Sequence, residues 1–277
     1  MHDSNIGNDH DRGLAADLEV MARRGSERRR VLALLIAGGS LAVAGRSTGV
    51  RAADSTCEPT PRETAGPFPA DGSNTRRGER LDVLDQQGVL RSDIRRSFGT
   101  SSTVAEGVPF ELRMRMVAAR RACAPLAGHA IYIWQADRRG EYSLYQGAAE
   151  RENYLRGVQV SDANGDVRFI TIYPSCYGGR YPHIHFEIFR PTEGSRARGP
   201  ATANRLLVSQ LAMPAEHCRH VYTQAAGYDG SRENFARMAT ATDGVFRDNT
   251  AAQLAAMTPR LRGNPAEGYT GEVTIAV

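Results

Sequence analysis

The chain of 277 residues contains no lysine, because all 35 of its basic residues are arginine. We interpret this absence as a compositional bias of the genome rather than as a sign of function. The formal net charge is +4, and half of it lies in the first 52 residues, where 8 arginines face 6 acidic residues. After residue 52 no arginine cluster is interleaved with aromatic residues, so the sequence gives little support for nucleic-acid binding.

Long hydrophobic runs are also missing. The most apolar stretch, residues 33–44, is shorter than the ~20 residues that a membrane-spanning helix needs. It follows a group of arginines and precedes the small-residue sequence at 50–52, which is the pattern of a signal peptide. Consecutive arginines before a mild, Gly- and Ala-rich core resemble a twin-arginine signal. We therefore expect export to the periplasm or the extracellular space, with transient contact with the twin-arginine machinery. An ordinary secretory signal or an uncleaved anchor are the alternatives.

Cysteines are few, and none forms a Cys-x-x-Cys pair, so the spacings are not those of a zinc site. The four cysteines all follow the predicted signal: Cys57, Cys123, Cys176 and Cys218. An even number in an exported chain predicts two disulfides, and four cysteines allow three pairings. The sequence does not choose among these pairings.

No helical segments alternate with the expected strands, and neither an internal repeat nor a linker after residue 57 is apparent. Short alternating or apolar runs predict strands at 110–116, 130–134, 167–172, 183–189, 206–212 and 272–277. A short helix is expected at 231–238 with Ser231 as its N-cap. The proline-rich residues 57–69 predict an ordered extended arm, and residues 70–105 a loop with at most a short helix. We predict an all-β fold for residues 53–277, an antiparallel β-sandwich with long loops and one or two short helices.

The expected strand at 183–189 carries the most informative pattern. Side chains alternate along a strand, so His183, His185 and Glu187 share one face while the intervening apolar residues share the other. Two imidazoles at positions i and i+2 on a stiff element suit a metal chelate, although such a pair is also common in structural roles. A turn just before them can bring the phenol of Tyr177 close. Two neutral nitrogens and a phenolate oxygen suit a hard, oxidised iron better than zinc or copper.

Three separated motifs resemble those of intradiol ring-cleavage dioxygenases. The first is the stretch 134–143, which is similar to the strand and loop that carry the family's first tyrosine ligand. The second is the turn at 173–177, and the third is the Arg-x-Pro-His-x-His sequence at 180–185. The arm at 63–68 resembles the family's Thr-x-Gly-Pro segment. The resemblance covers roughly residues 57–225 and is closest to the protocatechuate 3,4-dioxygenase branch, without the helical dimerisation segment of catechol 1,2-dioxygenases.

The resemblance implies a metal centre that holds one ferric ion per chain. Its ligands would be Tyr142, Tyr177, His183 and His185. Tyr142 and His183 would stay in the equatorial plane with a hydroxide, and Tyr177 and His185 would be axial. The neighbouring tyrosines at 145, 173 and 181 are expected to be structural.

The same resemblance implies a reaction and the residues that support it. A catechol-type ring would be cleaved between its two hydroxyls, with both atoms of O2 inserted, to give a cis,cis-muconate-type diacid. Tyr177 would leave the metal and take a substrate proton, Arg180 would stabilise developing charge, and Gln210 would form a hydrogen bond near the oxygen site. The residues implied in substrate binding are Thr64, Gly66 and Pro67.

Two other interpretations remain open at the sequence level. One is a non-catalytic exported β-sandwich that binds aromatic or carbohydrate ligands. The other is a zinc hydrolase, for which Glu187 is the only carboxylate close to the histidine pair. Within the dioxygenase interpretation the substrate stays open among catechol, protocatechuate, hydroxyquinol and larger aromatics, and a homo-oligomer is possible.

Overall fold

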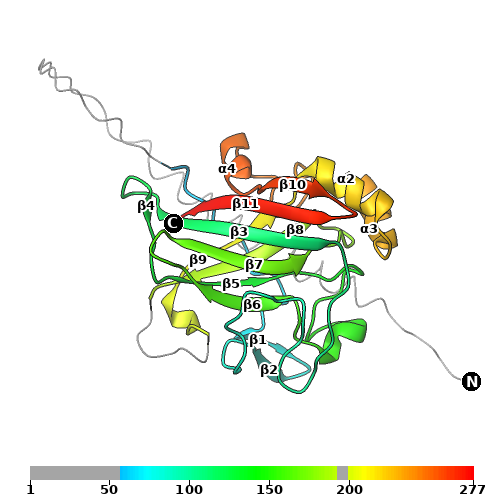
Figure 1. The fold of residues 1–277 in the computed structure, drawn as a ribbon, viewed down its shortest axis with the longest axis horizontal. Coiled ribbons are helices and arrows are strands. Elements are labelled where there is room, and N and C mark those ends of the chain that lie inside the picture. Colours follow the sequence, from blue (N-terminus) through cyan, green and yellow to red (C-terminus); the bar gives the residue numbers. More distant parts are fainter. Residues whose placement is uncertain (1–56, 192–198) are drawn as a thin grey trace, which may run out of the picture.

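The computed structural model describes residues 57–191 and 199–277, so the predicted signal at 1–52 lies outside the described residues. Two β-sheets lie face to face (Figure 1). In the first, β11 and β7 flank β3, while β10 extends the sheet beyond β11 and β4 pairs with the end of β3. The strands of this sheet are β3 (Pro109–Ala118), β4 (Ala124–Pro125), β7 (Asp166–Ile172), β10 (Arg260–Asn264) and β11 (Gly268–Ala276).

The second sheet has the order β6–β5–β8–β9 and is antiparallel throughout. Its strands are β5 (Ala130–Trp134), β6 (Arg156–Val160), β8 (His183–Phe189) and β9 (Arg205–Ala212). The predicted class, an antiparallel β-sandwich, is confirmed, and the six expected strands correspond to β3, β5, β7, β8, β9 and β11. One detail was not foreseen, since β11 runs parallel to β3.

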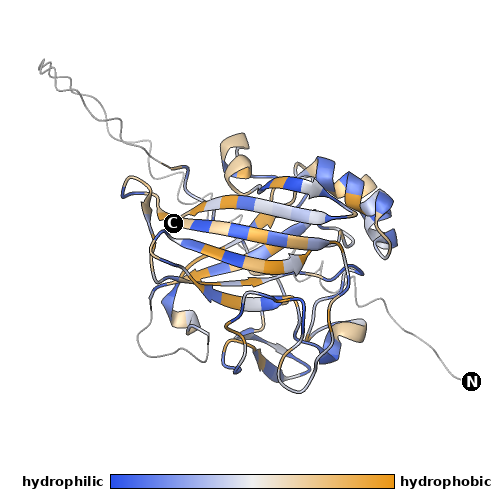
Figure 2. Cartoon of the chain, in the orientation of Figure 1, coloured by the Kyte–Doolittle hydropathy of each residue, from blue (hydrophilic) through white to orange (hydrophobic). Residues whose placement is uncertain are grey.

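The hydrophobic core between the sheets follows from the alternation of side chains. In β3 the apolar Phe110, Leu112 and Met114 are buried in this core, while the charged residues between them lie on the outer face of the sheet. Figure 2 shows the same alternation of hydrophobic and hydrophilic residues along β3 and β7. Burying each large apolar side chain stabilises the fold by about 1.5–3 kcal/mol.

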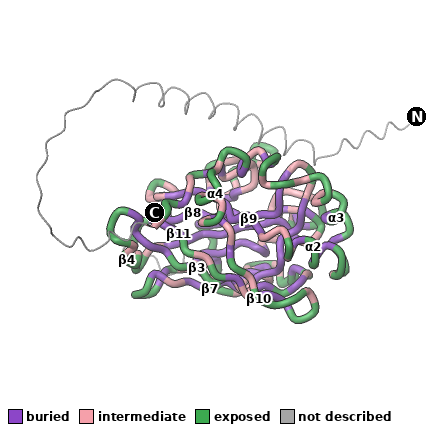
Figure 3. Tube along the Cα trace, turned by 90° about the horizontal axis from the view of Figure 1, so that it is seen from above, coloured by how far each residue is buried: buried purple, intermediate pink, exposed green. Residues whose placement is uncertain are grey.

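Strand β8 is buried on both faces, and all seven of its residues are buried. Its apolar side chains, including Ile184 and Phe186, join the core between the sheets. The other face of its sheet is covered by a second hydrophobic cluster that includes Tyr132, Trp134 and Tyr142. Figure 3 shows that exposed segments concentrate in the loops and helices around this interior. A polar face of β8 thus lies inside the protein, where its histidines must find partners.

A third, two-stranded sheet forms where the sequence predicted a loop. Its strands are β1 (Asp71–Arg76) and β2 (Glu79–Asp82), which pair antiparallel. Arg77 and Gly78 both have positive φ, at 50° and 85°, which is the backbone of a tight hairpin turn. These strands were not predicted because their sequence is polar, and a strand in a small surface hairpin needs no continuous apolar face.

The described residues contain three α-helices and two 3₁₀ segments, where one or two helices were expected. They are η1 (Gly147–Arg151), η2 (Thr202–Asn204), α2 (Ala215–Gln224), α3 (Asp229–Ala236) and α4 (Ala251–Ala256). None of the helices described here is long and apolar enough to cross a membrane. The predicted N-cap of α3 was wrong, because the helix begins at Asp229 after Tyr228. The Ser231 hydroxyl instead accepts a hydrogen bond from the Cys176 backbone N–H at 3.0 Å.

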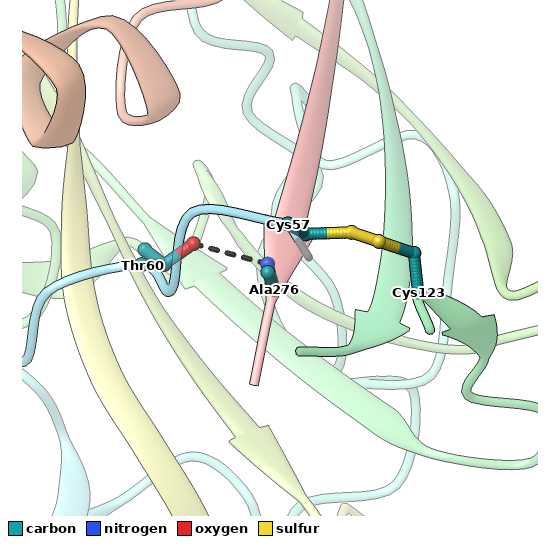
Figure 4. Close-up of a disulfide and its surroundings, with 4 residues drawn as sticks. All are labelled: Cys57, Thr60, Cys123 and Ala276. Atoms are coloured by element: carbon teal, nitrogen blue, oxygen red, sulfur yellow. Dashed lines mark hydrogen bonds between the residues drawn. A yellow bond between two sulfur atoms is a disulfide. The ribbon is translucent and has the colours of Figure 1, made fainter. Parts of the chain in front are cut away.

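The arm at 57–69 has no helix or strand, as its prolines predicted, and it is held at both ends. Cys57 forms a disulfide with Cys123. Near it, the Thr60 backbone N–H donates to the Ala276 carbonyl at 2.9 Å, and the Ala276 N–H donates to the Thr60 hydroxyl at 3.1 Å. Figure 4 shows the disulfide to Cys123 and the hydrogen bond from the Ala276 N–H to the Thr60 hydroxyl, which ties the arm to the last strand. At the far end Phe68 packs on the ring of Tyr142, with a centroid separation of 4.9 Å.

The expectation of two disulfides was wrong, since Cys176 and Cys218 are buried free thiols. Each sulfur instead forms a hydrogen-bond contact with another group. The Cys176 thiol donates to the Arg180 carbonyl at 3.4 Å, and Cys218 Sγ lies 3.2 Å from the Tyr173 hydroxyl. Burial raises the pKa of Cys218 to about 12, which keeps this sulfur a neutral thiol. Both cysteines therefore serve as small core side chains.

Removing the single disulfide should destabilise the fold. The bridge closes a loop across a sequence separation of 66 residues, for which loop-closure entropy alone corresponds to about 4 kcal/mol. We expect a Cys57→Ser/Cys123→Ser variant to unfold at lower denaturant concentration, as measured by circular dichroism. Reductant should reproduce this loss in the wild type and have no further effect on the variant. Equal stability of variant and wild type would show that the arm needs no covalent tether.

Candidate metal centre

The register of the second sheet aligns four side chains in one row across its strands. Trp134 on β5 is opposite His185 on β8 and, on its other side, Arg156 on β6. His185 is in turn opposite Gln210 on β9. Directly opposite residues point to the same face of a sheet, so an aromatic ring, an imidazole, an amide and a guanidinium share the covered face.

Two tyrosines meet the histidines of β8 at this face, and we call Tyr142, Tyr177, His183 and His185 the Tyr–His cluster. The Tyr142 hydroxyl oxygen lies 3.2 Å from His183 Nε2 and 3.1 Å from His185 Nε2. The Tyr177 hydroxyl oxygen lies 3.3 Å from His183 Nε2 and 3.5 Å from the Tyr142 oxygen. The two Nε2 atoms are 3.0 Å apart. Residues from three separate parts of the chain thus turn their polar atoms toward one point.

Loop geometry brings the two phenols together. Tyr142 lies in the loop that follows β5, and Tyr177 lies in the turn before β8. Gly140, with φ of 92°, packs against Tyr177 so closely that an added Cβ would lie 3.1 Å from the Tyr177 Cβ. A side chain at position 140 would meet both a strained backbone conformation and the second phenol.

The Tyr–His cluster fits a metal ion. Ligand bonds of ~2.0–2.2 Å at right angles place neighbouring donor atoms about 3 Å apart, and the measured separations are 3.0–3.5 Å. Two oxygen and two nitrogen donors of this kind suit a hard, oxidised iron.

The two histidines are held as neutral imidazoles. The His183 Nδ1–H donates to the Tyr181 carbonyl at 2.6 Å, which leaves the Nε2 lone pair directed at the cluster. Burial, reinforced by the charge of Arg180, lowers the pKa of His183. Burial and then the neighbouring His183 lower the pKa of His185. His185 is oriented differently, by stacking flat on Trp134 with centroids 4.8 Å apart and an interplanar angle of 6°.

Arg180 is buried beside the cluster and is held on two sides. Its Nε donates to Asp243 Oδ2 at 3.0 Å, and its Nη2 donates to Gln210 Oε1 at 2.6 Å. Burial acts to raise the pKa of Asp243, but the guanidinium and the backbone N–H of Tyr181 outweigh it, so the pKa is lowered. Sequence reasoning identified Arg180 and Gln210 but missed Asp243, which follows a polar loop without a recognisable motif.

The arm reaches the cluster through Gln210 and Phe68. The Gln210 amide donates to the Thr64 carbonyl at 2.9 Å, while the Thr64 hydroxyl accepts from the Gly66 N–H at 3.0 Å. Gly66 has a φ of 68°, and the Pro67 carbonyl accepts a hydrogen bond from the Asn74 amide at 2.6 Å. Thr64, Gly66 and Pro67 thus lie in the segment of the arm that reaches the cluster, and their hydrogen bonds shape the arm itself; their contact with a substrate stays a prediction.

A buried arginine that sequence analysis missed connects the arm to the tyrosine loop. Arg156 donates from Nε to the Ser143 hydroxyl and from Nη2 to the Ser143 carbonyl, both at 2.9 Å. Its Nη1 donates to the Pro69 carbonyl at 3.1 Å and to the Tyr132 hydroxyl at 3.0 Å. A guanidinium offers five donors in a fixed plane, so it can fix both segments at once. Arg156 precedes a glycine and belongs to no recognisable motif, so the sequence did not indicate its role.

The hydroxyls of the three neighbouring tyrosines are used elsewhere. The Tyr145 hydroxyl donates to the Asn74 side chain at 2.8 Å, and Tyr173 lies against a core cysteine. The Tyr181 hydroxyl donates to the Met213 carbonyl at 2.8 Å. The geometry thus separates these structural phenols from the two in the cluster.

Glu187 shares the face of the histidines but pairs away from them. Its Oε1 accepts from Arg205, which also pairs with Asp71 at 3.1 Å. Within the described ranges no group of three or more His, Cys, Asp and Glu residues could hold a metal ion. Burial, followed by the charge of Asp71, raises the pKa of Glu187 to about 8.

This raised pKa predicts a pH dependence of stability. The folded state binds a proton at Glu187 between the ordinary pKa of about 4.5 and the raised value of about 8, where the unfolded chain has lost it. The contribution of Glu187 is therefore favourable at low pH and is lost as pH rises through this window. Glu187→Gln should flatten the fall in denaturation free energy between pH 5 and 8, by on the order of 3 kcal/mol.

Glu111→Gln supplies the matched control. Glu111 lies on the outer face of the first sheet. The hydrogen bond from Arg168 lowers its pKa to about 2, so it does not titrate between pH 5 and 8. Urea titrations of both variants at four pH values would test the assignment. An unchanged pH profile in Glu187→Gln would contradict it.

A family model described as a dioxygenase matches residues 100–224, a stretch that includes the whole Tyr–His cluster and Gln210 and ends with α2. No match is found among curated proteins. Among solved structures, an intradiol ring-cleavage dioxygenase from Tetranychus urticae is 22% identical, with 79% of this chain and 94% of that chain covered and a TM-score of 0.59.

Two further structures are similar at lower TM-scores. The dioxygenase domain of a carbohydrate-binding fusion protein from Streptomyces sp. SirexAA-E is 23% identical, covering 79% of this chain and 98% of that chain, with a TM-score of 0.47. Catechol 1,2-dioxygenase from Acinetobacter sp. ADP1 is 18% identical, covering 99% and 72%, also with a TM-score of 0.47. The chain therefore shares the fold of the Tetranychus dioxygenase, over nearly all of that protein's length.

Proposed function

We propose that the chain is a member of the intradiol ring-cleavage dioxygenases and uses one Fe(III) ion to cleave a catechol-type ring between its two hydroxyls. Both atoms of O2 would enter the product, a cis,cis-muconate-type diacid. The observation that carries the proposal is the convergence of two phenol oxygens and two imidazole nitrogens within 3.0–3.5 Å. The matching family model and the shared fold agree with it.

The bound iron would supply the electron-accepting centre that makes a catecholate reactive toward O2. Tyr142, Tyr177, His183 and His185 would hold it. Anionic phenolate ligands favour the ferric state, because hard oxygen donors match the higher charge. Every other contribution comes from side chains that bind, orient or move protons.

Tyr177 is better placed than Tyr142 to act as a base. Tyr142 is 1% exposed, covered by Phe68, and lies within 3.2 Å of both histidine nitrogens. Tyr177 is only partly buried and sits in a turn beside two glycines. A phenolate that swings away from the cluster at this edge can accept a proton from an arriving catechol hydroxyl.

Arg180 and Gln210 would position and stabilise the reacting group. Because Asp243 and Gln210 fix the guanidinium, its charge is oriented before substrate arrives and requires little reorganisation during the reaction. Gln210 in turn contacts Thr64 of the arm, so the arm and the charged group form one connected wall. This wall would line the substrate side of the centre, together with Gly66 and Pro67.

We further propose that residues 53–277 work as one exported domain in the periplasm or outside the cell, after twin-arginine export. The Cys57–Cys123 disulfide supports this proposal, since such bonds persist in oxidising compartments. The partners would be a small catechol-type molecule and O2, and a homo-oligomer is compatible with the described surface.

Iron analysis and oxygen uptake test the proposed function together. Purified protein should contain one iron per chain, show the red-brown colour of ferric tyrosinate, and consume O2 with catechol, protocatechuate or hydroxyquinol while forming a ring-opened diacid. Product identification by mass spectrometry with ¹⁸O2 should show both labelled atoms. Correctly folded, iron-loaded protein that consumes no O2 across a broad panel of catechols would favour the binding-module interpretation instead.

The Tyr177→Phe variant tests the role of the movable phenol. We expect it to retain most of the iron, because three donors remain, but to lose turnover by about 10²-fold or more as the base is lost. Tyr145→Phe is the matched control, since its hydroxyl bonds to Asn74 outside the cluster. Turnover at the wild-type rate in Tyr177→Phe would exclude the assigned role.

A further inference from the structure

A cavity opens between α2 and α3, outside the Tyr–His cluster. Its volume is about 490 Å³, within the ~300–1,000 Å³ range of small-molecule sites. None of the four cluster residues lines it. The proposed dioxygenase function does not use this cavity, so its shape and charge require a separate explanation.

Three aromatic residues line this cavity, of which Phe235 is partly exposed while Tyr181 and Tyr222 are each only 4% exposed. Phe235 packs against Tyr181 and Tyr222, with ring centroids 5.7 and 5.6 Å apart. The two tyrosine hydroxyls are not available to a ligand, because they donate to the Met213 carbonyl at 2.8 Å and to the Pro174 carbonyl at 2.9 Å. The cavity therefore presents aromatic carbon, mainly that of Phe235, rather than phenol hydroxyls.

Two arginines border the same cavity. Arg219 on α2 and Arg232 on α3 are exposed and line it, and no acidic residue does so. Among residues 57–191 and 199–277, no ion pair or side-chain hydrogen bond engages either guanidinium. Arg115, by contrast, forms an ion pair with Asp166. Two guanidinium groups and an aromatic side chain in one cavity form a complementary surface for an aromatic anion.

We propose that this cavity is a second binding site for a small aromatic carboxylate. The ring would pack chiefly against Phe235, which Tyr181 and Tyr222 support from within the fold, and the carboxylate would accept hydrogen bonds from Arg219 and Arg232. Guanidinium groups match the planar, two-oxygen geometry of a carboxylate. Aromatic stacking adds affinity that an inorganic anion cannot gain. The ligand needs no vicinal hydroxyls, which distinguishes this site from a metal centre that binds catechols.

Binding of 4-fluorobenzoate to the full iron-loaded protein tests this proposal by ¹⁹F NMR titration. We expect the Arg219→Gln/Arg232→Gln variant to bind at least about tenfold more weakly, because both charge-assisted contacts are lost. Arg120→Gln/Arg121→Gln is the matched control, since it removes two exposed arginines from a distant turn and should bind like the wild type. Ala239→Trp should block the cavity without changing its charge and should also abolish binding.

Two ligand controls and one protein control separate the outcomes. Neutral 4-fluorobenzamide should bind at least about tenfold more weakly than the carboxylate, and inorganic phosphate should not displace 4-fluorobenzoate. A Tyr142→Phe variant should bind the probe as the wild type does, even where oxygen uptake is lost. The proposal is overturned if the wild type does not bind the probe, if the double glutamine variant binds it equally well, or if the amide binds as tightly.

Discussion

The covering of both faces of β8 is the constraint on which the rest of the structure depends. One face belongs to the core between the two sheets, so its side chains must be apolar. The other face carries His183, His185 and Glu187, and covering it removes three polar groups from water. Such burial is costly unless each group finds a partner. The surrounding segments meet most of this demand, the histidines with phenols and the glutamate with Arg205, while His185 Nδ1 and Glu187 Oε2 have no hydrogen-bond partner among the described residues.

The two phenols come from segments with no regular structure, and a few buried polar contacts fix the positions of these segments. Arg156 holds the tyrosine loop and the arm together, and Gln210 joins the arm to Arg180. The rigid β-sandwich thus carries the histidines, while loops tied by hydrogen bonds carry the phenols. This division explains why the arm is anchored at its start by a disulfide and at its end by an aromatic contact.

Strands with a clear alternation of side chains could be predicted from the sequence, because burial on one face leaves a period of two. Residues 110–116 and 183–189 are examples, and the shared face of His183 and His185 followed directly from the second. The hairpin of β1 and β2 could not be predicted this way, because its strands are polar. Strand β6 was missed because Arg156 and Gly157 interrupt its apolar pattern. The roles of Asp243 and Arg156 depend on contacts across 63 and 87 residues, which no local signal encodes. The free state of Cys176 and Cys218 likewise depends on tertiary neighbours rather than on their number.

The stacking of Trp134 on His185 gives the protein a built-in optical probe. Trp134 is the chain's only tryptophan, and it lies fully buried with its ring parallel to an imidazole of the Tyr–His cluster. All indole emission therefore arises from one position, directly against an imidazole of the Tyr–His cluster. Occupation of the centre by a coloured ferric species would quench that emission, so metal loading becomes observable in real time without any label.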